Sequence, residues 1–79
     1  MITAQPVTIA TGDEFVDGRL IYVGDALIGV LQHLEGSHYE QEGQWNLEAG
    51  FGPLEDCEEV FPTVDAAIDW IRKLISSPT

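Results

Sequence analysis

The single cysteine of the chain, Cys57, lies in an acidic stretch, GFGPLEDCEEVFPT (residues 50–63). Four carboxylates flank it within two residues, and the stretch contains no basic residue: Glu55, Asp56, Glu58 and Glu59. A catalytic cysteine needs a positively charged setting that favours the thiolate. These acidic neighbours favour the neutral thiol, so we do not expect Cys57 to act as a nucleophile with His33 or His38. If its side chain points inward, Cys57 is a small core residue.

The same residues are poor candidates for a metal site or for acid–base catalysis. Structural zinc sites use three or four Cys or His ligands at close spacing, whereas this chain offers one cysteine and two histidines. The acids of residues 55–59 lack the spacing of a calcium-binding loop. Catalytic carboxylate pairs need a cleft that moves their pKa values apart, and a chain of 79 residues has little room for one. We therefore expect no catalytic residue, metal or cofactor.

Net charge is the outlying property of the chain. Fourteen acidic residues oppose three basic ones, which gives a formal net charge of -11. Such a chain should be repelled by nucleic acid, because nucleic-acid affinity comes largely from Lys and Arg at the phosphates. Anionic membrane surfaces are disfavoured for the same reason. A basic surface of another protein is the natural counterpart. Alternatively, the charge serves solubility alone.

The candidate partner-binding residues lie in two expected loops, 35–43 and 52–62. Each of them carries a carboxylate, and neither loop contains a Lys or Arg: Glu35, Glu40, Glu42, Glu55, Asp56, Glu58 and Glu59. Alternate turns of a meander lie at the same end of a sheet, so these clusters and the acids of the N-terminal turns could merge into one field. The competing interpretation is that acids collect in loops because loops are hydrated, and that acids before a helix favour its N-terminus.

The elements that must position these residues follow from turn signals and periodicity. Residues 1–5 are expected to be frayed, and 6–10 form a candidate edge strand because Pro6 is tolerated only at an edge or a strand start. Asp17-Gly18 and Gly24-Asp25 are typical hairpin turns. They bracket a β-forming run at 19–23.

Two further strands are predicted after the second turn. Residues 26–34 favour a strand that bends at Gly29. Residues 44–51 alternate between apolar and polar, which predicts a half-buried strand. Its apolar positions are Trp45, Leu47, Ala49 and Phe51. Gly52-Pro53 should end it.

The C-terminal segment predicts an amphipathic helix. Thr63 is a suitable N-cap, and apolar residues follow at helical spacing on one stripe: Val64, Ala67, Ile68, Ile71, Leu74 and Ile75. The economical packing is an α+β fold, an antiparallel meander of three to four strands with this helix across one face. That face is expected to be the one carrying the apolar residues of 44–51. The chain is one domain, 1–79, with 77–79 frayed.

We expect a cytoplasmic location. The N-terminal residues lack the basic and apolar regions of a signal peptide, no apolar run is long enough for a membrane span, and one cysteine cannot form an internal disulfide. In a phage- or plasmid-encoded protein this means the host cytoplasm. The oligomeric state, monomer or homodimer, is left open.

Two functional hypotheses follow from the sequence. The first is a non-enzymatic binding module that docks on the basic nucleic-acid-binding surface of a partner protein, in the manner of anti-CRISPR or anti-restriction inhibitors. The second is a stand-alone housekeeping or antitoxin-like domain that binds through an apolar patch. Exposed aromatic residues would distinguish them, with Tyr22, Tyr39 and Trp70 as the candidates.

Overall fold

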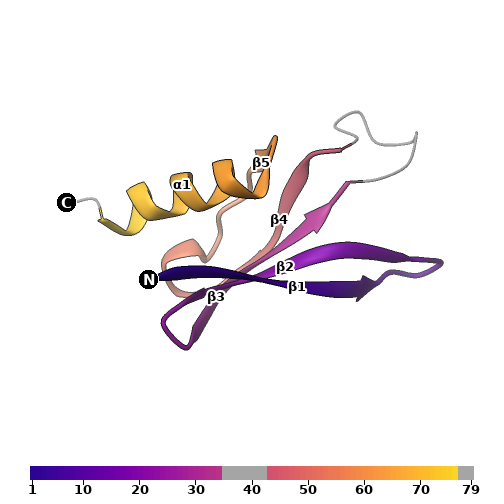
Figure 1. Cartoon of the computed structure of the whole chain (residues 1–79), viewed down its shortest axis with the longest axis horizontal. Helices are drawn as coiled ribbons and strands as arrows, with labels where there is room; N and C mark the ends of the chain where they lie inside the picture. The colour runs from indigo at the N-terminus through magenta and orange to yellow at the C-terminus, as the bar shows by residue number, and fades with distance from the viewer. Residues whose placement is uncertain (35–42, 77–79) are drawn as a thin grey trace.

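The computed structural model describes residues 1–34 and 43–76 of the chain. They form one antiparallel sheet of five strands in sequence order, followed by a helix (Figure 1). The strands are β1 (Ile2–Ala10), β2 (Phe15–Val23), β3 (Ala26–His33), β4 (Trp45–Gly50) and β5 (Val60–Phe61). A short 3-10 helix, η1 (Gly52–Leu54), connects β4 to β5, and the C-terminal helix is α1 (Val64–Ser76). The predicted α+β meander with one C-terminal helix is confirmed, and the two-residue β5 is an additional strand.

Strand β1 is longer than its sequence suggests. It pairs with β2 without interruption from Ile2, opposite Val23, to Ala10, opposite Phe15. The prediction that residues 1–5 are frayed is therefore wrong. Ile2 and Ala4 are held because they pack against the main core. The predicted fraying of 77–79 lies outside the described residues.

The two predicted hairpin turns have different outcomes. Gly24-Asp25 connects β2 to β3, with Gly24 at a φ of +62°, as that turn requires. Asp17-Gly18 is not a turn, because both residues lie inside β2. The β1–β2 connection is made instead at residues 11–14, where Thr11 N donates to Glu14 O at 2.8 Å. Gly18 is instead a point of close packing, since a Cβ atom there would displace the Ile9 side chain.

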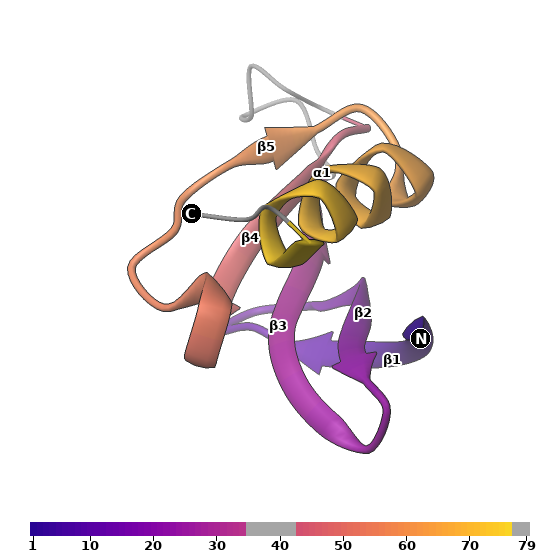
Figure 2. The same ribbon diagram turned by 90° about the vertical axis from the view of Figure 1, so that its left-hand side faces the viewer.

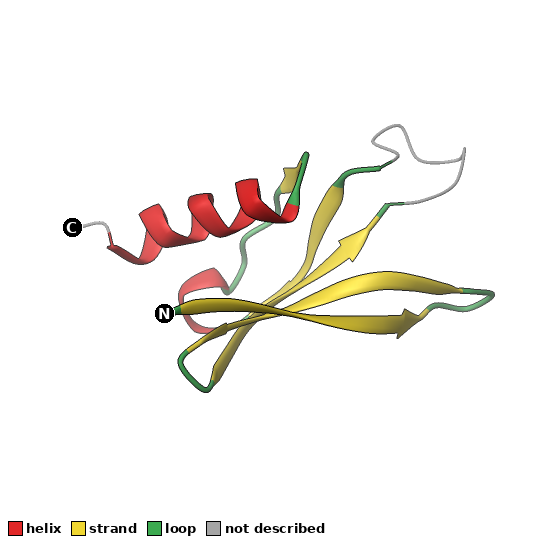
Figure 3. Ribbon diagram, in the orientation of Figure 1, coloured by secondary structure: helices red, strands yellow, loops and turns green. Residues whose placement is uncertain are grey.

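Two register shifts bend the middle of the sheet. One lies in the β2–β3 ladder, where the pairs Ile21–Gly29 and Tyr22–Leu27 leave Ile28 as an extra residue. This fits the predicted bend near Gly29. Figure 3 shows the resulting twist of the long strands.

The second register shift changes the faces of β4. Leu31 pairs with Leu47 and Val30 with Ala49, so Glu48 is the extra residue. Strict alternation is broken there. Leu47 stays in the main core, but Ala49 joins the opposite face with Val30. The expectation that the whole apolar set of 44–51 faces the helix is therefore wrong beyond residue 47, and Phe51 is exposed.

Helix α1 begins as predicted and packs on one face of the sheet (Figure 2). Thr63 Oγ1 accepts a hydrogen bond from Ala66 N at 3.0 Å, which caps the helix. Ala67 and Ile71 are fully buried against sheet residues that include Ile21 and Leu31. The stripe does not bury its last turn, where Leu74 and Ile75 are exposed. No helix among the described residues is long and apolar enough to cross a membrane.

Burial in the first hairpin changes sides along its length. At the start of β1, Ile2 and Ala4 are half-buried on the face that carries the helix. Beyond Pro6 the half-buried residues are Val7 and Ile9, which lie on the opposite face of the sheet. Val16, opposite Ile9 on β2, is buried as well. The sheet is thus apolar under the helix at one end and apolar on its other face at the far end.

Candidate functional site

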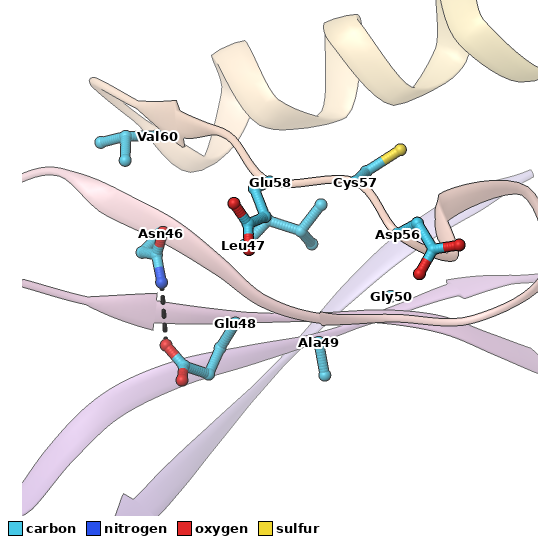
Figure 4. A pocket seen from close by; sticks show the side chains of 9 residues that line it. All are labelled: Asn46, Leu47, Glu48, Ala49, Gly50, Asp56, Cys57, Glu58 and Val60. Carbon is cyan, nitrogen blue, oxygen red and sulfur yellow. Dashed lines mark hydrogen bonds between the residues drawn. The ribbon is translucent and has the colours of Figure 1, made fainter.

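A hollow lies between the edge of β4 and the segment that leads from η1 to β5 (Figure 4). Its lining comes from both sides: Asn46, Leu47, Glu48, Ala49, Gly50, Asp56, Cys57, Glu58 and Val60. The hollow exists because β5 pairs only with Trp45 and Asn46. One further bond, from Leu47 N to Glu59 O at 2.9 Å, holds the two segments together before they separate.

The acidic segment, which we define as residues 55–59, is anchored at its start by η1. Leu54 is fully buried, and its carbonyl accepts a hydrogen bond from Cys57 N at 3.1 Å. Glu55 N donates to Gly52 O at the same distance. Asp56 turns the chain with a φ of +65°, a left-handed conformation that Asp and Asn tolerate better than most residues. A tight backbone turn therefore presents this segment, rather than side-chain contacts.

All four predicted carboxylates of the acidic segment are exposed: Glu55, Asp56, Glu58 and Glu59. Asp56 and Glu58 line the hollow from the acidic segment, and Glu48 lines it from β4 with its side chain turned toward Asn46 (Figure 4). The Glu48 carboxylate accepts a hydrogen bond from Asn46 Nδ2 at 2.8 Å. The sequence prediction missed Glu48, although its place among the polar positions of a half-buried strand was a signal that it would face solvent.

The three basic residues of the chain lie away from this hollow. Arg19 lies over the Trp45 ring, 4.8 Å from its centroid, and donates to Gly18 O. Arg72 pairs with Asp69 on the exposed side of α1 at 3.0 Å. Lys73 lies in the last turn of the helix. None of the three lines the hollow, and none forms an ion pair with a carboxylate of residues 55–59.

The other acids singled out in the sequence fall into two groups, those outside the described residues and those of the β1–β2 turn. Glu35, Glu40 and Glu42 lie outside the described residues, so their merging with the acidic segment stays a prediction. Asp13 and Glu14 lie in the β1–β2 turn, at the opposite end of the sheet from η1 (Figure 1). The acids of that turn therefore form a separate cluster.

Cys57 and His33 are not brought together. Cys57 is half-buried and packs against the core beside the end of β4. His33 pairs with Trp45 at the beginning of β4, and the two rings make a tilted contact with centroids 4.6 Å apart. His38 lies outside the described residues. No group of three His, Cys, Asp or Glu side chains suited to a metal ion occurs in the described part of the chain.

Of the aromatic residues expected to mark an apolar patch, the two in the described part of the chain, Tyr22 and Trp70, are half-buried. Trp70 packs at a tilt against Phe61, with ring centroids 5.4 Å apart. Tyr39 lies outside the described residues. A shallow apolar groove lies elsewhere, between the β2–β3 hairpin, η1 and the end of α1. Its lining is apolar throughout: Val23, Ala26, Ile28, Pro53, Leu74 and Ile75.

Comparison with known proteins adds no relative. No protein-family model, curated protein or solved structure matches the chain.

Proposed function

We propose that this protein is a non-enzymatic binding module whose acidic segment docks on a basic surface of a partner protein. The observation that carries the proposal is the group of exposed carboxylates at residues 55–59, none of which forms an ion pair with a Lys or Arg among the described residues. Carboxylates kept without counter-charges repel one another. A basic partner removes that repulsion, which makes the association favourable.

The partner class follows from the arrangement of the charges. Several carboxylates on one short, turned segment roughly imitate successive phosphates of a nucleic acid. A Lys- and Arg-lined groove that normally holds DNA or RNA would accept such a segment. The most concrete form of the proposal is a cytoplasmic inhibitor that occupies such a groove, as anti-CRISPR or anti-restriction proteins do.

The competing function uses the apolar groove at the end of α1. Leu74 and Ile75 line it and are exposed although they belong to the amphipathic stripe of the helix. A housekeeping or antitoxin-like domain would bind its partner there, and its acids would serve only solubility. The two functions respond differently to salt, because apolar contacts are not screened whereas charge pairs are.

Two matched quadruple variants test the acidic segment. The site variant is E55Q/D56N/E58Q/E59Q, and the control is D13N/E14Q/D17N/D25N, which removes the same number of charges elsewhere. Binding of a polyarginine peptide is measured by calorimetry from about 50 mM to about 200 mM NaCl. We expect affinity to fall steeply with salt for the native chain and the control, and the site variant to bind at least tenfold more weakly than the control at low salt.

An equal loss of polyarginine affinity in both variants would show that the affinity depends on net charge alone. That result would contradict docking at residues 55–59. A salt-independent affinity that is lost in L74S/I75S would favour the apolar groove instead.

A further inference from the structure

Strand β1 is an open edge of the sheet. It pairs with β2 on one side, and no described element pairs with its other side. At the two ends of β1, Met1 O accepts a hydrogen bond from Gly24 N, and Thr11 N donates one to Glu14 O. The backbone groups of these two odd-numbered residues therefore point toward the β2 side of the hairpin. Backbone groups alternate in an antiparallel ladder. The even-numbered residues of β1 therefore direct their N–H and C=O groups outward.

This edge lacks most of the features that usually keep edge strands apart. Natural edges are short, charged, bulged or covered. Here nine residues pair in an unbroken register, and the first twelve residues of a chain with a net charge of -11 include no charged side chain. Two copies of so acidic a chain repel each other over most of their surfaces, and least along this strand. A neutral edge suits a neutral partner strand, and the chain itself supplies one.

Pro6 is the one blocking residue, and it restricts how a second strand can align. Being even-numbered, it faces outward, where its missing N–H does not disturb the β1–β2 ladder. A two-fold axis at Pro6 would place two prolines opposite each other with no donor between them. A two-fold axis at Val7 avoids this, because Thr8 N–H of each copy then meets Pro6 C=O of the other.

The same alignment covers an otherwise unexplained aromatic residue. Phe15 is 76% exposed and pairs with Ala10 across the hairpin. With the axis at Val7, Ala10 faces Ala4 of the second copy, so Phe15, Ala10 and that Ala4 lie in one row on one face. Two strand spacings separate the ends of the row, about 10 Å. The two alanines leave room for the ring to lie toward the apolar edge of the other copy, where Ile2 and Ala4 pack.

We propose that the chain forms a two-fold homodimer by antiparallel pairing of β1 with β1 of a second copy, with Phe15 as the side-chain anchor. The sheets of the two copies become continuous, and the acidic segments stay away from the new interface because they adjoin β4, three strands away. Since screening weakens the repulsion between two acidic copies, dimerisation strengthens with salt. Docking of a basic partner weakens with salt, so failure of one proposal leaves the other testable.

Amide hydrogen exchange on the native chain tests the pairing directly. At dilute concentration we expect slow exchange at Thr3, Gln5, Val7 and Ile9 and fast exchange at the outward amides of Ile2, Ala4, Thr8 and Ala10. At high concentration in about 0.5 M NaCl, where charges are screened within about 4 Å, Ala4, Thr8 and Ala10 become protected at least tenfold. Sedimentation equilibrium under the same conditions should report a dimer.

A matched pair of variants isolates the outward backbone. T8P removes one outward N–H without touching the β1–β2 ladder, and T8A keeps it. We expect T8A to dimerise like the native chain, T8P to weaken dimerisation at least tenfold, and F15S to weaken it as well.

A chain that stays monomeric at about 1 mM in high salt would overturn the proposal. So would a dimer whose outward β1 amides still exchange quickly, because it must use another surface. The exchange measurement decides even if T8P fails to fold.

Discussion

Leu54 lies so close over Gly50 that a Cβ atom on Gly50 would overlap the carbonyl group of Leu54. Gly29, paired with Gly50 across the sheet, widens the same space, since a Cβ there would meet the Leu54 and Leu47 side chains. The two glycines form a floor on which the fully buried Leu54 rests. This contact folds η1 back over the exit of β4 and so sets where the acidic segment begins.

Gly50→Ala should therefore be strongly destabilising. The new methyl group meets backbone atoms, which cannot rotate away, so η1 must shift and Leu54 loses its packing. We expect the free energy of unfolding to fall by about 3 kcal/mol, measured by urea denaturation. Gly12→Ala is the control, because nothing lies within 4 Å of a Cβ atom there. Equal stability of the two variants would contradict the close contact between Gly50 and Leu54.

The helix stripe predicts a contrast between two isoleucines one turn apart. Ile71 is fully buried in the core, whereas Ile75 is 36% exposed beside the apolar groove. Ile71→Ala should lower the free energy of unfolding by about 2–5 kcal/mol. Ile75→Ala should cost well under half as much, because it leaves no enclosed cavity. Thermal unfolding of both variants checks the difference, and similar losses would mean that Ile75 contributes to the core as much as Ile71 does.

Much of this fold is predictable from the sequence, because the deciding signals are local. The stripe from Val64 to Ile71 and the cap at Thr63 indicate α1, and Gly24-Asp25 indicates the second hairpin. The failures involve contacts distant in sequence. Gly18 lies inside β2, packed closely against Ile9, rather than in a turn. No local pattern marks the bulge at Glu48 that moves Ala49 to the other face.

The candidate site is predictable in composition but not in arrangement. The acids at 55–59 and their exposure are predictable from the sequence. The hollow depends on β5 ending its pairing at Asn46, which no periodicity in a two-residue strand can indicate. Glu48 lines the hollow as the extra residue of the β3–β4 register shift, which no local pattern marks.

The N-cap of α1 should contribute measurably to stability. Thr63→Ala removes the oxygen that accepts from Ala66 N, and we expect a loss of about 1 kcal/mol. Thr63→Ser keeps the hydroxyl and should recover most of that loss. Helix content from circular dichroism and the unfolding midpoint check both variants. If Ser is no better than Ala, the hydrogen bond does not stabilise the helix.

Removal of the thiol should leave binding intact. Cys57→Ala trims a half-buried side chain that packs against the core, so we expect a loss of stability of about 1 kcal/mol and an unchanged affinity for polyarginine. His33→Gln should behave in the same way in the binding assay. A large loss of affinity in either variant, without unfolding, would show that the proposed surface omits an essential residue.

The sign of a stability change distinguishes acids kept for binding from acids kept for folding. No described Lys or Arg pairs with the exposed carboxylates of residues 55–59, so these groups repel one another in the free protein. The variant E55Q/D56N/E58Q/E59Q should therefore raise Tm by about 4 °C or less at low salt, and Asn at position 56 keeps the left-handed turn acceptable. The gain should vanish in about 1 M NaCl, where repulsion is screened.

A variant that is less stable than the native chain would mean that these carboxylates support the fold. A variant that is more stable yet binds polyarginine poorly would mean that the charges are retained, at a cost to stability, for a partner.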